Sequence, residues 1–213
     1  MADYTHYGSA LSPEWTEFAK TYTPPSLPED VNMAKEIFND ARTALFQRVL
    51  GPIGAISLHH VPLHFSDCCS AAVSSEDVSV PTRDGHHIPC RLSFPDVRNS
   101  SNHSLPLYIY MHGGGYLFGS VETEDAHCQL LAVGVPCVVL NVGYRHTPEW
   151  TFPTPFQDVF DAVDWITETS RAKQFNIDLS NVVIGGVSAG ATMSVAAAVR
   201  EIEQVRNRLL DES

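Results

Sequence analysis

A serine stands within a run of small residues at 186–190, with the sequence Gly-Val-Ser-Ala-Gly. In the pattern Gly-x-Ser-x-Gly the serine occupies a sharp turn between a strand and a helix, and its neighbours must be small for the two elements to approach. An apolar run at 181–184 precedes this segment and a helical pattern follows it. We therefore expect the hydroxyl of Ser188 to be presented for nucleophilic attack. The small residues of this turn are Gly186, Ala189 and Gly190.

A second glycine-rich segment, His112-Gly113-Gly114-Gly115-Tyr116, follows the apolar run at 107–111. A backbone without side chains allows N–H groups to approach a developing negative charge closely. We expect N–H groups of the loop at Gly113, Gly114 and Gly115, with the N–H of Ala189 as a third donor, to stabilise the oxyanion formed when Ser188 attacks a carbonyl group. A phosphate-binding loop is the main alternative, but the lysine that such a loop carries is missing. A simple tight turn would not require three consecutive glycines.

The elements that must position these two segments alternate along the chain. Short apolar runs at 107–111, 135–142 and 181–184 predict buried parallel strands. Helical patterns lie near 122–133, near 156–168 and after Ser188. Before them, two alternating segments flank Asp84-Gly85, which is a strong hairpin signal. The sequence therefore predicts an α/β fold, with a mostly parallel sheet and an N-terminal antiparallel hairpin.

The first 55 residues predict helices joined by proline-rich turns. Ser26 and Glu29 have the spacing of a capping box, and Gly51-Pro52 ends the helical pattern that follows. Apolar residues of this helix recur at steps of three and four, at Val31, Ala34, Phe38, Ala41, Leu45 and Val49. We expect this stripe to pack on the main domain. The predicted domains are a helical N-terminal cap segment at 1–75 and a partial α/β domain at 76–213.

From about residue 76 to about residue 200 the sequence resembles the hormone-sensitive-lipase-like family of α/β-hydrolases, which includes esterases and lipases. The resemblance implies an α/β-hydrolase fold and a serine carboxylic ester hydrolase that acts on short to medium acyl esters without a cofactor. It implies Ser188 as the nucleophile, an oxyanion hole of Gly113, Gly114 and Ala189, and an N-terminal cap over the acyl pocket. The segments that carry it are HGGGYLFGS at 112–120, Glu122 to Asp125, Tyr144 to Glu149, Phe152-Pro153, Asp158, Trp165 and the turn at 186–190, with His112, Gly115, Gly186 and Gly190 as motif residues.

The sequence also departs from the family pattern. Val187 and Ala191 replace an aspartate and a glycine, and His146 replaces an apolar residue. The family's triad runs in the order Ser, Asp or Glu, His along the chain, but no histidine follows Ser188. We therefore expect the triad acid and histidine, and the last strands and helices of the fold, to be absent from this chain. The edge at 182–184 would then be unpaired, which favours a homo-oligomer or a complementing chain.

A second class of function remains open. A catalytically dead α/β-hydrolase can act as a small-molecule-binding protein, and the plant gibberellin receptors resemble this family and lack a working triad histidine. The intact Ser188 and the intact glycine loop favour the enzyme. Serine-dependent hydrolysis of a small ester would distinguish the enzyme from the small-molecule-binding protein.

Composition excludes several other partners. The net charge of −12 over 213 residues disfavours nucleic acid and anionic membrane surfaces. No apolar run is long enough to span a bilayer, and the N-terminus has no secretory pattern, so we expect a cytoplasmic protein. The five cysteines lack paired zinc-type spacing and are expected to be reduced thiols. His59, His60 and His64, with Asp67 and Cys68 nearby, predict a surface loop rather than a metal site.

Overall fold

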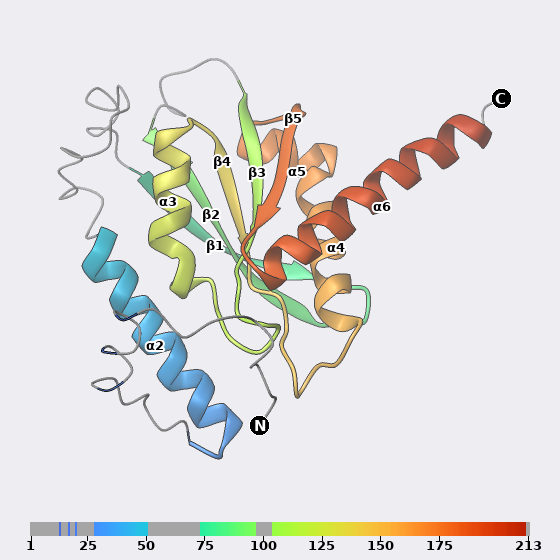
Figure 1. Cartoon of the computed structure of the whole chain (residues 1–213). Coiled ribbons are helices and arrows are strands. Elements are labelled where there is room, and N and C mark those ends of the chain that lie inside the picture. Colours follow the sequence, from blue (N-terminus) through green and yellow to red (C-terminus); the bar gives the residue numbers. More distant parts are fainter. Residues whose placement is uncertain are drawn as a thin grey trace. The chain divides into compact units, whose positions relative to one another are not determined.

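The computed structural model describes residues 28–50, 73–96 and 104–211, together with positions 13, 17 and 20 (Figure 1). The chain divides into two units, Met1–Ala34 and Lys35–Ser213. Helix α2 comprises Val31–Leu50. At its start the backbone N–H of Met33 donates to Asp30 Oδ1 at 2.9 Å, so Asp30 caps the helix. Glu29 of the expected capping box precedes the helix, so the capping-box prediction is wrong. The domain boundary expected between residues 75 and 76 stays a prediction.

A five-stranded mixed sheet forms the centre of the second unit, with the strand order β1-β2-β4-β3-β5. The hairpin expected around Asp84-Gly85 is present, since β1 and β2 pair antiparallel on either side of it. β2 pairs antiparallel with β4, whereas β3 pairs parallel with both β4 and β5. The predicted α/β fold with a mostly parallel sheet and an antiparallel N-terminal hairpin is confirmed. The strands are β1 Val73–Pro81, β2 His87–Pro95, β3 Leu105–Met111, β4 Val138–Val142 and β5 Ile177–Gly186.

Helices cover both faces of this sheet (Figure 1). The connection from β3 to β4 contains the short 3₁₀ helix η5, Glu122–Glu124, and α3, Asp125–Gly134, which packs on one face. The connection from β4 to β5 passes over β3 on the other face through α4, Thr154–Thr167, and α5, Thr169–Phe175. The last helix, α6, Ala189–Asp211, packs beside α4 on that second face. This arrangement is the three-layer architecture expected of parallel strands joined by crossover helices.

The strand β5 lies at the edge of the described sheet and is incompletely covered. Its described residues pair with β3 alone, and the side chain of Val183 is 52% exposed. Farther along, α6 extends beyond the sheet (Figure 1), and Ile202 on it is 67% exposed. The edge expected at 182–184 is thus unpaired on one side among the described residues. The other exposed apolar residues of this region include Val195, Val199, Val205 and Leu210.

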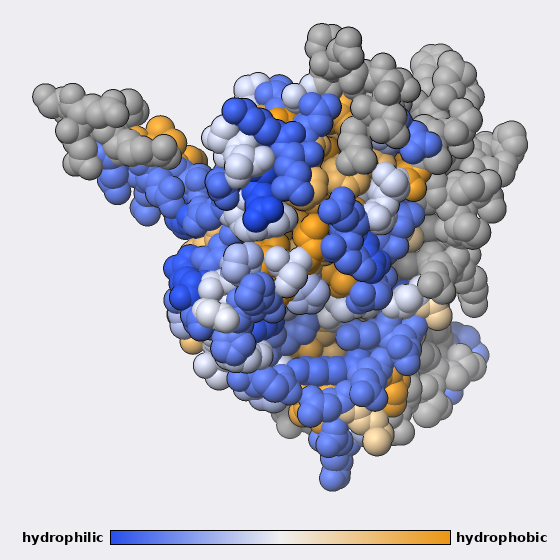
Figure 2. Space-filling view, turned by 180° about the vertical axis from the view of Figure 1, so that it is seen from behind, coloured by the Kyte–Doolittle hydropathy of each residue, from blue (hydrophilic) through white to orange (hydrophobic). Residues whose placement is uncertain are grey.

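The face shown in Figure 2 is mostly hydrophilic where residues are described, with smaller hydrophobic areas between the polar ones. This surface agrees with a chain that carries 25 acidic and 13 basic residues. Among the described helices, none combines the length and the apolar character that a bilayer crossing requires.

Candidate active site

The two glycine-rich segments meet because β3 and β5 are adjacent parallel strands. Met111, the last residue of β3, is in register with Gly186, the last residue of β5. One residue further on, the backbone N–H of Val187 donates to Met111 O at 3.3 Å. The carboxyl ends of both strands therefore lie at the same end of the sheet. The loop after β3 lies against the turn that contains Ser188.

The turn after β5 is as tight as the Gly-x-Ser-x-Gly pattern predicts. A Cβ atom on Gly186 would lie 2.5 Å from Met111 O. A Cβ atom on Gly190 would overlap the same oxygen and lie 2.6 Å from His112 O. Both contacts are with backbone atoms, which have little freedom to move aside. Glycine is therefore required at both positions for the strand and helix to approach.

Ser188 adopts a backbone conformation that is uncommon for a residue with a side chain. Its φ angle is +54°, in the left-handed region, and α6 begins directly after it at Ala189. A Cβ atom built on Gly113 would lie 3.4 Å from the Ser188 Cβ. The glycine loop and the serine turn are thus in direct contact. Backbone strain of this kind gathers at functional sites.

The three N–H groups expected to bind an oxyanion are available for a ligand. Within the described residues, no hydrogen bond has the backbone N–H of Gly113, Gly114 or Ala189 as its donor. Ala189 is also the first residue of α6, where N–H groups have no partner within the helix and the helix dipole favours a negative charge. The structure thus brings Gly113 into contact with the turn that contains Ser188 and Ala189.

The glycine loop has a tightly wound backbone. Gly114 and Gly115 have φ angles of +137° and +62°, and Tyr116 follows at +64°. The carbonyl oxygen of Gly114 accepts from the N–H groups of Leu117 at 3.0 Å and Phe118 at 2.9 Å. These bonds close the loop on itself.

His112 supports the loop as a buried neutral ring. Its side chain is fully buried and lies 4.2 Å from the ring of Tyr144, in a stacked arrangement. Burial lowers the pKa of His112 to about 3, so the ring carries one N–H at neutral pH. Since Nδ1 lies 3.0 Å from Gly113 O, which can only accept, we assign that N–H to Nδ1. The Tyr144 hydroxyl in turn donates to His112 O at 2.8 Å.

The loop after β4 fixes Tyr144 through a buried ion pair. Asp158, fully buried in α4, accepts from the backbone N–H of Arg145 at 2.9 Å and from its guanidinium at 2.9 Å and 2.5 Å. The same guanidinium donates to Asp84 at 2.8 Å, and this hydrogen bond holds the pKa of Asp84 well below its usual range. The Tyr-Arg pair and Asp158 of the family pattern are therefore one structural unit beneath the glycine loop.

Helix α2 reaches the site through polar side chains that sequence reasoning did not single out. Asn39 Oδ1 accepts from the N–H of Gly119 at 2.8 Å. Arg42 donates to Gly113 O at 3.3 Å and forms an ion pair with the carboxylate of Glu124. The apolar stripe contributes Phe38, whose ring stacks on Phe118 at 4.4 Å. In the sequence, one signal could have identified these polar side chains. It is their spacing at steps of four and three, at Lys35, Asn39 and Arg42.

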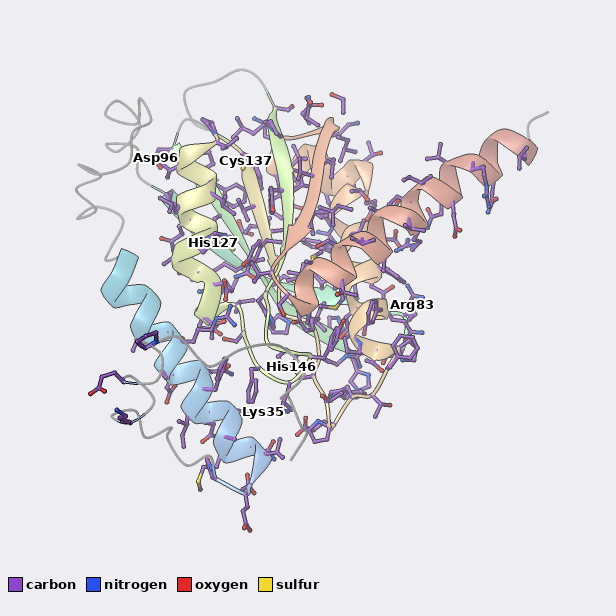
Figure 3. All side chains as sticks on the ribbon, viewed as in Figure 1. Lys35, Arg83, Asp96, His127, Cys137 and His146 are labelled. Atoms are coloured by element: carbon purple, nitrogen blue, oxygen red, sulfur yellow. The ribbon has the colours of Figure 1, made fainter. Side chains whose placement is uncertain are left out.

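A second histidine, His146, lies near the glycine loop, and Lys35 of α2 influences its charge (both are labelled in Figure 3). Lys35 Nζ donates to Glu149 Oε2 at 2.7 Å. His146 lies edge-on to the rings of His112 and Tyr144, at 5.2 Å and 5.0 Å. Burial, followed by the positive charge of Lys35, lowers the pKa of His146 to about 4. Both described histidines near the loop are thus neutral at physiological pH.

A cavity of about 290 Å³ opens beside the glycine loop. Its walls are mostly apolar and include Tyr116 of the loop itself. The carbonyl oxygen of Tyr116 is held by the backbone N–H of Thr147 at 2.9 Å and its hydroxyl at 3.1 Å. The remaining wall residues are Phe152, Pro155 and Phe156.

Among the described residues, no group of three or more His, Cys, Asp or Glu side chains is placed to hold a metal ion. The cluster of His59, His60 and His64 lies outside the described residues. Cys90, Cys128 and Cys137 are free and buried, and burial raises the pKa of the Cys90 thiol to about 12. A thiol with so high a pKa is a poor nucleophile.

Residues 108–209 match the sequence profile of a family described as alpha/beta hydrolase fold. Together with the sheet topology, this match shows that the chain has an α/β-hydrolase fold over these residues. The chain is 36% identical to an ethyl acetate hydrolase of Pseudomonas putida over 149 residues, which are 68% of this chain and 44% of that relative. It is 32% identical to an arylesterase of Saccharolobus solfataricus over 125 residues, which are 59% of this chain and 39% of that relative.

The solved structure of an esterase from Pyrobaculum calidifontis is similar to this chain, with a TM-score of 0.66 and 27% sequence identity. The similarity covers 92% of this chain and 54% of that structure. The chain therefore spans about half the length of the relatives and structures that it matches. The expectation of an α/β-hydrolase fold is confirmed over this span.

Proposed function

We propose that the protein is a serine carboxylic ester hydrolase with Ser188 as its nucleophile. The observation that carries this proposal is the contact between the glycine loop and Ser188 at the ends of β3 and β5. The left-handed backbone of Ser188 supports it, because such strain is expected of a nucleophile on a strand-to-helix turn. The esterase relatives support the choice of an ester as substrate.

In the proposed reaction, Ser188 Oγ forms a bond to the carbonyl carbon of the ester and releases its proton. The carbonyl oxygen becomes an oxyanion, which accepts hydrogen bonds from the N–H groups of Gly113, Gly114 and Ala189. Collapse of this intermediate breaks the ester bond, releases the alcohol with a proton, and leaves Ser188 acylated. Attack by water then releases the acid and restores the serine hydroxyl.

We propose no described residue as the general base that accepts the proton of Ser188. His112 and His146 are neutral rings in contact with Tyr144, and the Nδ1 N–H of His112 is used on Gly113 O. Without a general base, a serine is a weak nucleophile near neutral pH, and loss of a triad member costs several orders of magnitude in rate. We therefore expect slow acylation of Ser188 in this chain unless a base is supplied.

The test compares the full chain with Ser188→Ala in the hydrolysis of p-nitrophenyl acetate, with and without added imidazole as a base. We expect release of p-nitrophenol that Ser188→Ala abolishes and that imidazole increases beyond its own reaction in water. Ser170→Ala is the matched control, because Ser170 is an exposed serine of α5 whose hydroxyl contacts Glu168. Equal rates for the chain and Ser188→Ala under both conditions, from folded protein, would contradict the proposal and favour the small-molecule-binding alternative.

A small ester remains the proposed partner, and homo-oligomerisation or binding of a complementing chain remains a proposal as well. The uncovered β5 edge supports association with another chain, because exposed strand edges pair readily with other chains.

A further inference from the structure

Arg42 of α2 contacts the glycine loop at the peptide group that would bind the oxyanion. Its Nη1 atom lies 3.3 Å from Gly113 O. The carbonyl of Gly113 and the N–H of Gly114 belong to the same planar peptide group, in which they point in opposite directions. Fixing the carbonyl on one side therefore fixes the direction of the N–H on the other.

The Gly113 carbonyl receives two donors, which is the number that its lone pairs accommodate. The second donor is Nδ1 of His112, at 3.0 Å. A glycine on either side of a peptide group leaves it free to rotate, because neither residue restricts its own backbone angles. Two hydrogen bonds, one from the preceding residue of the loop and one from α2, remove that freedom. They also polarise the peptide group, which strengthens its N–H as a donor.

The guanidinium of Arg42 is itself held in place. It forms an ion pair with Glu124, whose side chain is only 2% exposed, while that of Arg42 is 17% exposed. The other carboxylate oxygen of Glu124 accepts from the Tyr110 hydroxyl at 3.0 Å. Burial and the neighbouring carboxylate raise the pKa of Tyr110 well above its usual value, so the hydroxyl remains a donor. A chain of fixed groups thus leads from β3 through Glu124 and Arg42 to the loop.

We propose that Arg42 is a positioning residue that orients the Gly113–Gly114 peptide so that the N–H of Gly114 faces the developing oxyanion. Arg42 does not touch the substrate, and its effect passes through the peptide group. The proposal rests on the ester hydrolysis proposed above. It assigns a function to Arg42 of α2, since Glu124 anchors the arginine and the arginine anchors the loop.

The test replaces Arg42 in two ways. Arg42→Met removes the charge, and Arg42→Lys keeps the ion pair with Glu124 but loses the fork that reaches two acceptors at once. Removal of one oxyanion donor lowers kcat by about 10² to 10³-fold, so we expect the misorientation of one donor to lower kcat by roughly 10 to 100-fold. KM should change by less than about 2-fold, since the contact matters in the transition state. Lys35→Met is the control, a lysine of the same helix that pairs with Glu149 and not with Glu124.

Two further measurements separate positioning from a general loss of structure. The affinity for a trifluoromethyl ketone, which forms a charged tetrahedral adduct with the serine, should fall by the same factor as kcat in both Arg42 variants. In a ¹⁵N-labelled chain, the amide signals of Gly113 and Gly114 should shift and exchange faster in Arg42→Met and Arg42→Lys, but not in Lys35→Met.

The outcomes are distinct. A fall in kcat without a matching fall in ketone affinity would overturn the proposal, as would equal effects from Lys35→Met. If the unmodified chain hydrolyses no ester, the proposed function fails, and the amide signals then decide the positioning proposal alone. Unchanged Gly114 signals in Arg42→Lys would overturn it even in an active enzyme. If Arg42→Met does not fold, Arg42→Lys carries the test, because its charge still satisfies Glu124.

Discussion

Replacing Arg145 by methionine should destabilise the protein far more than the same change at Arg83, although both arginines pair with an aspartate of α4. Asp158 is fully buried, and Arg145 supplies both its side-chain donors and one backbone donor. Breaking a buried pair on one side leaves an uncompensated charge and costs about 3 to 5 kcal/mol. Because the backbone N–H of residue 145 would still donate to Asp158, we expect about 3 kcal/mol. The Arg83 side chain is 46% exposed, so its pair with Asp161 should contribute about 1 kcal/mol or less.

The measurement is urea unfolding at pH 7 followed by far-ultraviolet circular dichroism. Fluorescence is less suitable, because the Arg145 guanidinium lies 4.4 Å from the centre of the Trp150 ring and its loss would alter the signal directly. In the double variant Arg145→Met with Asp158→Asn, most of the lost stability should return, since the buried charge is gone. Equal losses for Arg145→Met and Arg83→Met, or no recovery in the double variant, would refute the reasoning from burial.

Two further predictions follow from the glycine positions and the buried histidines. Gly190→Ala should destabilise the fold by about 3 kcal/mol or more, since its Cβ would overlap Met111 O. Gly115→Ala has open space and should cost only about 1 kcal/mol through its φ of +62°; similar losses in urea unfolding would contradict the packing argument. The folded pKa of His146, about 4, lies below the ordinary value of 6.5, so stability is complete above about pH 6.5 and falls as the pH drops toward 4. His146→Leu should therefore reduce the stability difference between pH 7 and pH 5 by about 1 to 2 kcal/mol, and an unchanged difference would contradict it.

Local sequence patterns predicted most of the elements but not all of their limits. The runs at 107–111 and 181–184 fall within β3 and β5. Burial on both faces, which such runs predict, is correct for β3, but it is wrong for β5, where Val183 is 52% exposed at the sheet edge. β4 begins at Val138 rather than at Val135, whose side chain is 64% exposed in the turn after α3. Helix α5 was not predicted, because seven residues with only Ala172 and Phe175 buried carry too short a pattern to recognise.

Some residues around the proposed oxyanion hole can be identified from the sequence, and others cannot. Glycines and a serine have a local signature, since the turn and the loop need small residues at fixed spacing. Arg42 and Glu124 have none, because a charged residue on a helix usually faces solvent, and the acidic segment around Glu124 gives no sign that one carboxylate is buried. Arg42 and Glu124 are 82 positions apart in the sequence, so only the tertiary structure brings them into one ion pair.

The segment from His112 to Gly119 is held at four points by groups from α2 and from the loop after β4. Tyr144 donates to His112 O, Arg42 donates to Gly113 O, Thr147 donates to Tyr116 O, and Asn39 accepts from Gly119 N. A loop rich in glycine would otherwise lose more conformational entropy than any other when it becomes ordered. Oxyanion stabilisation is effective only where the donors are already oriented before the charge develops. It follows that α2, which supplies two of these four contacts, should affect kcat more than KM, although none of its residues is proposed to touch the substrate.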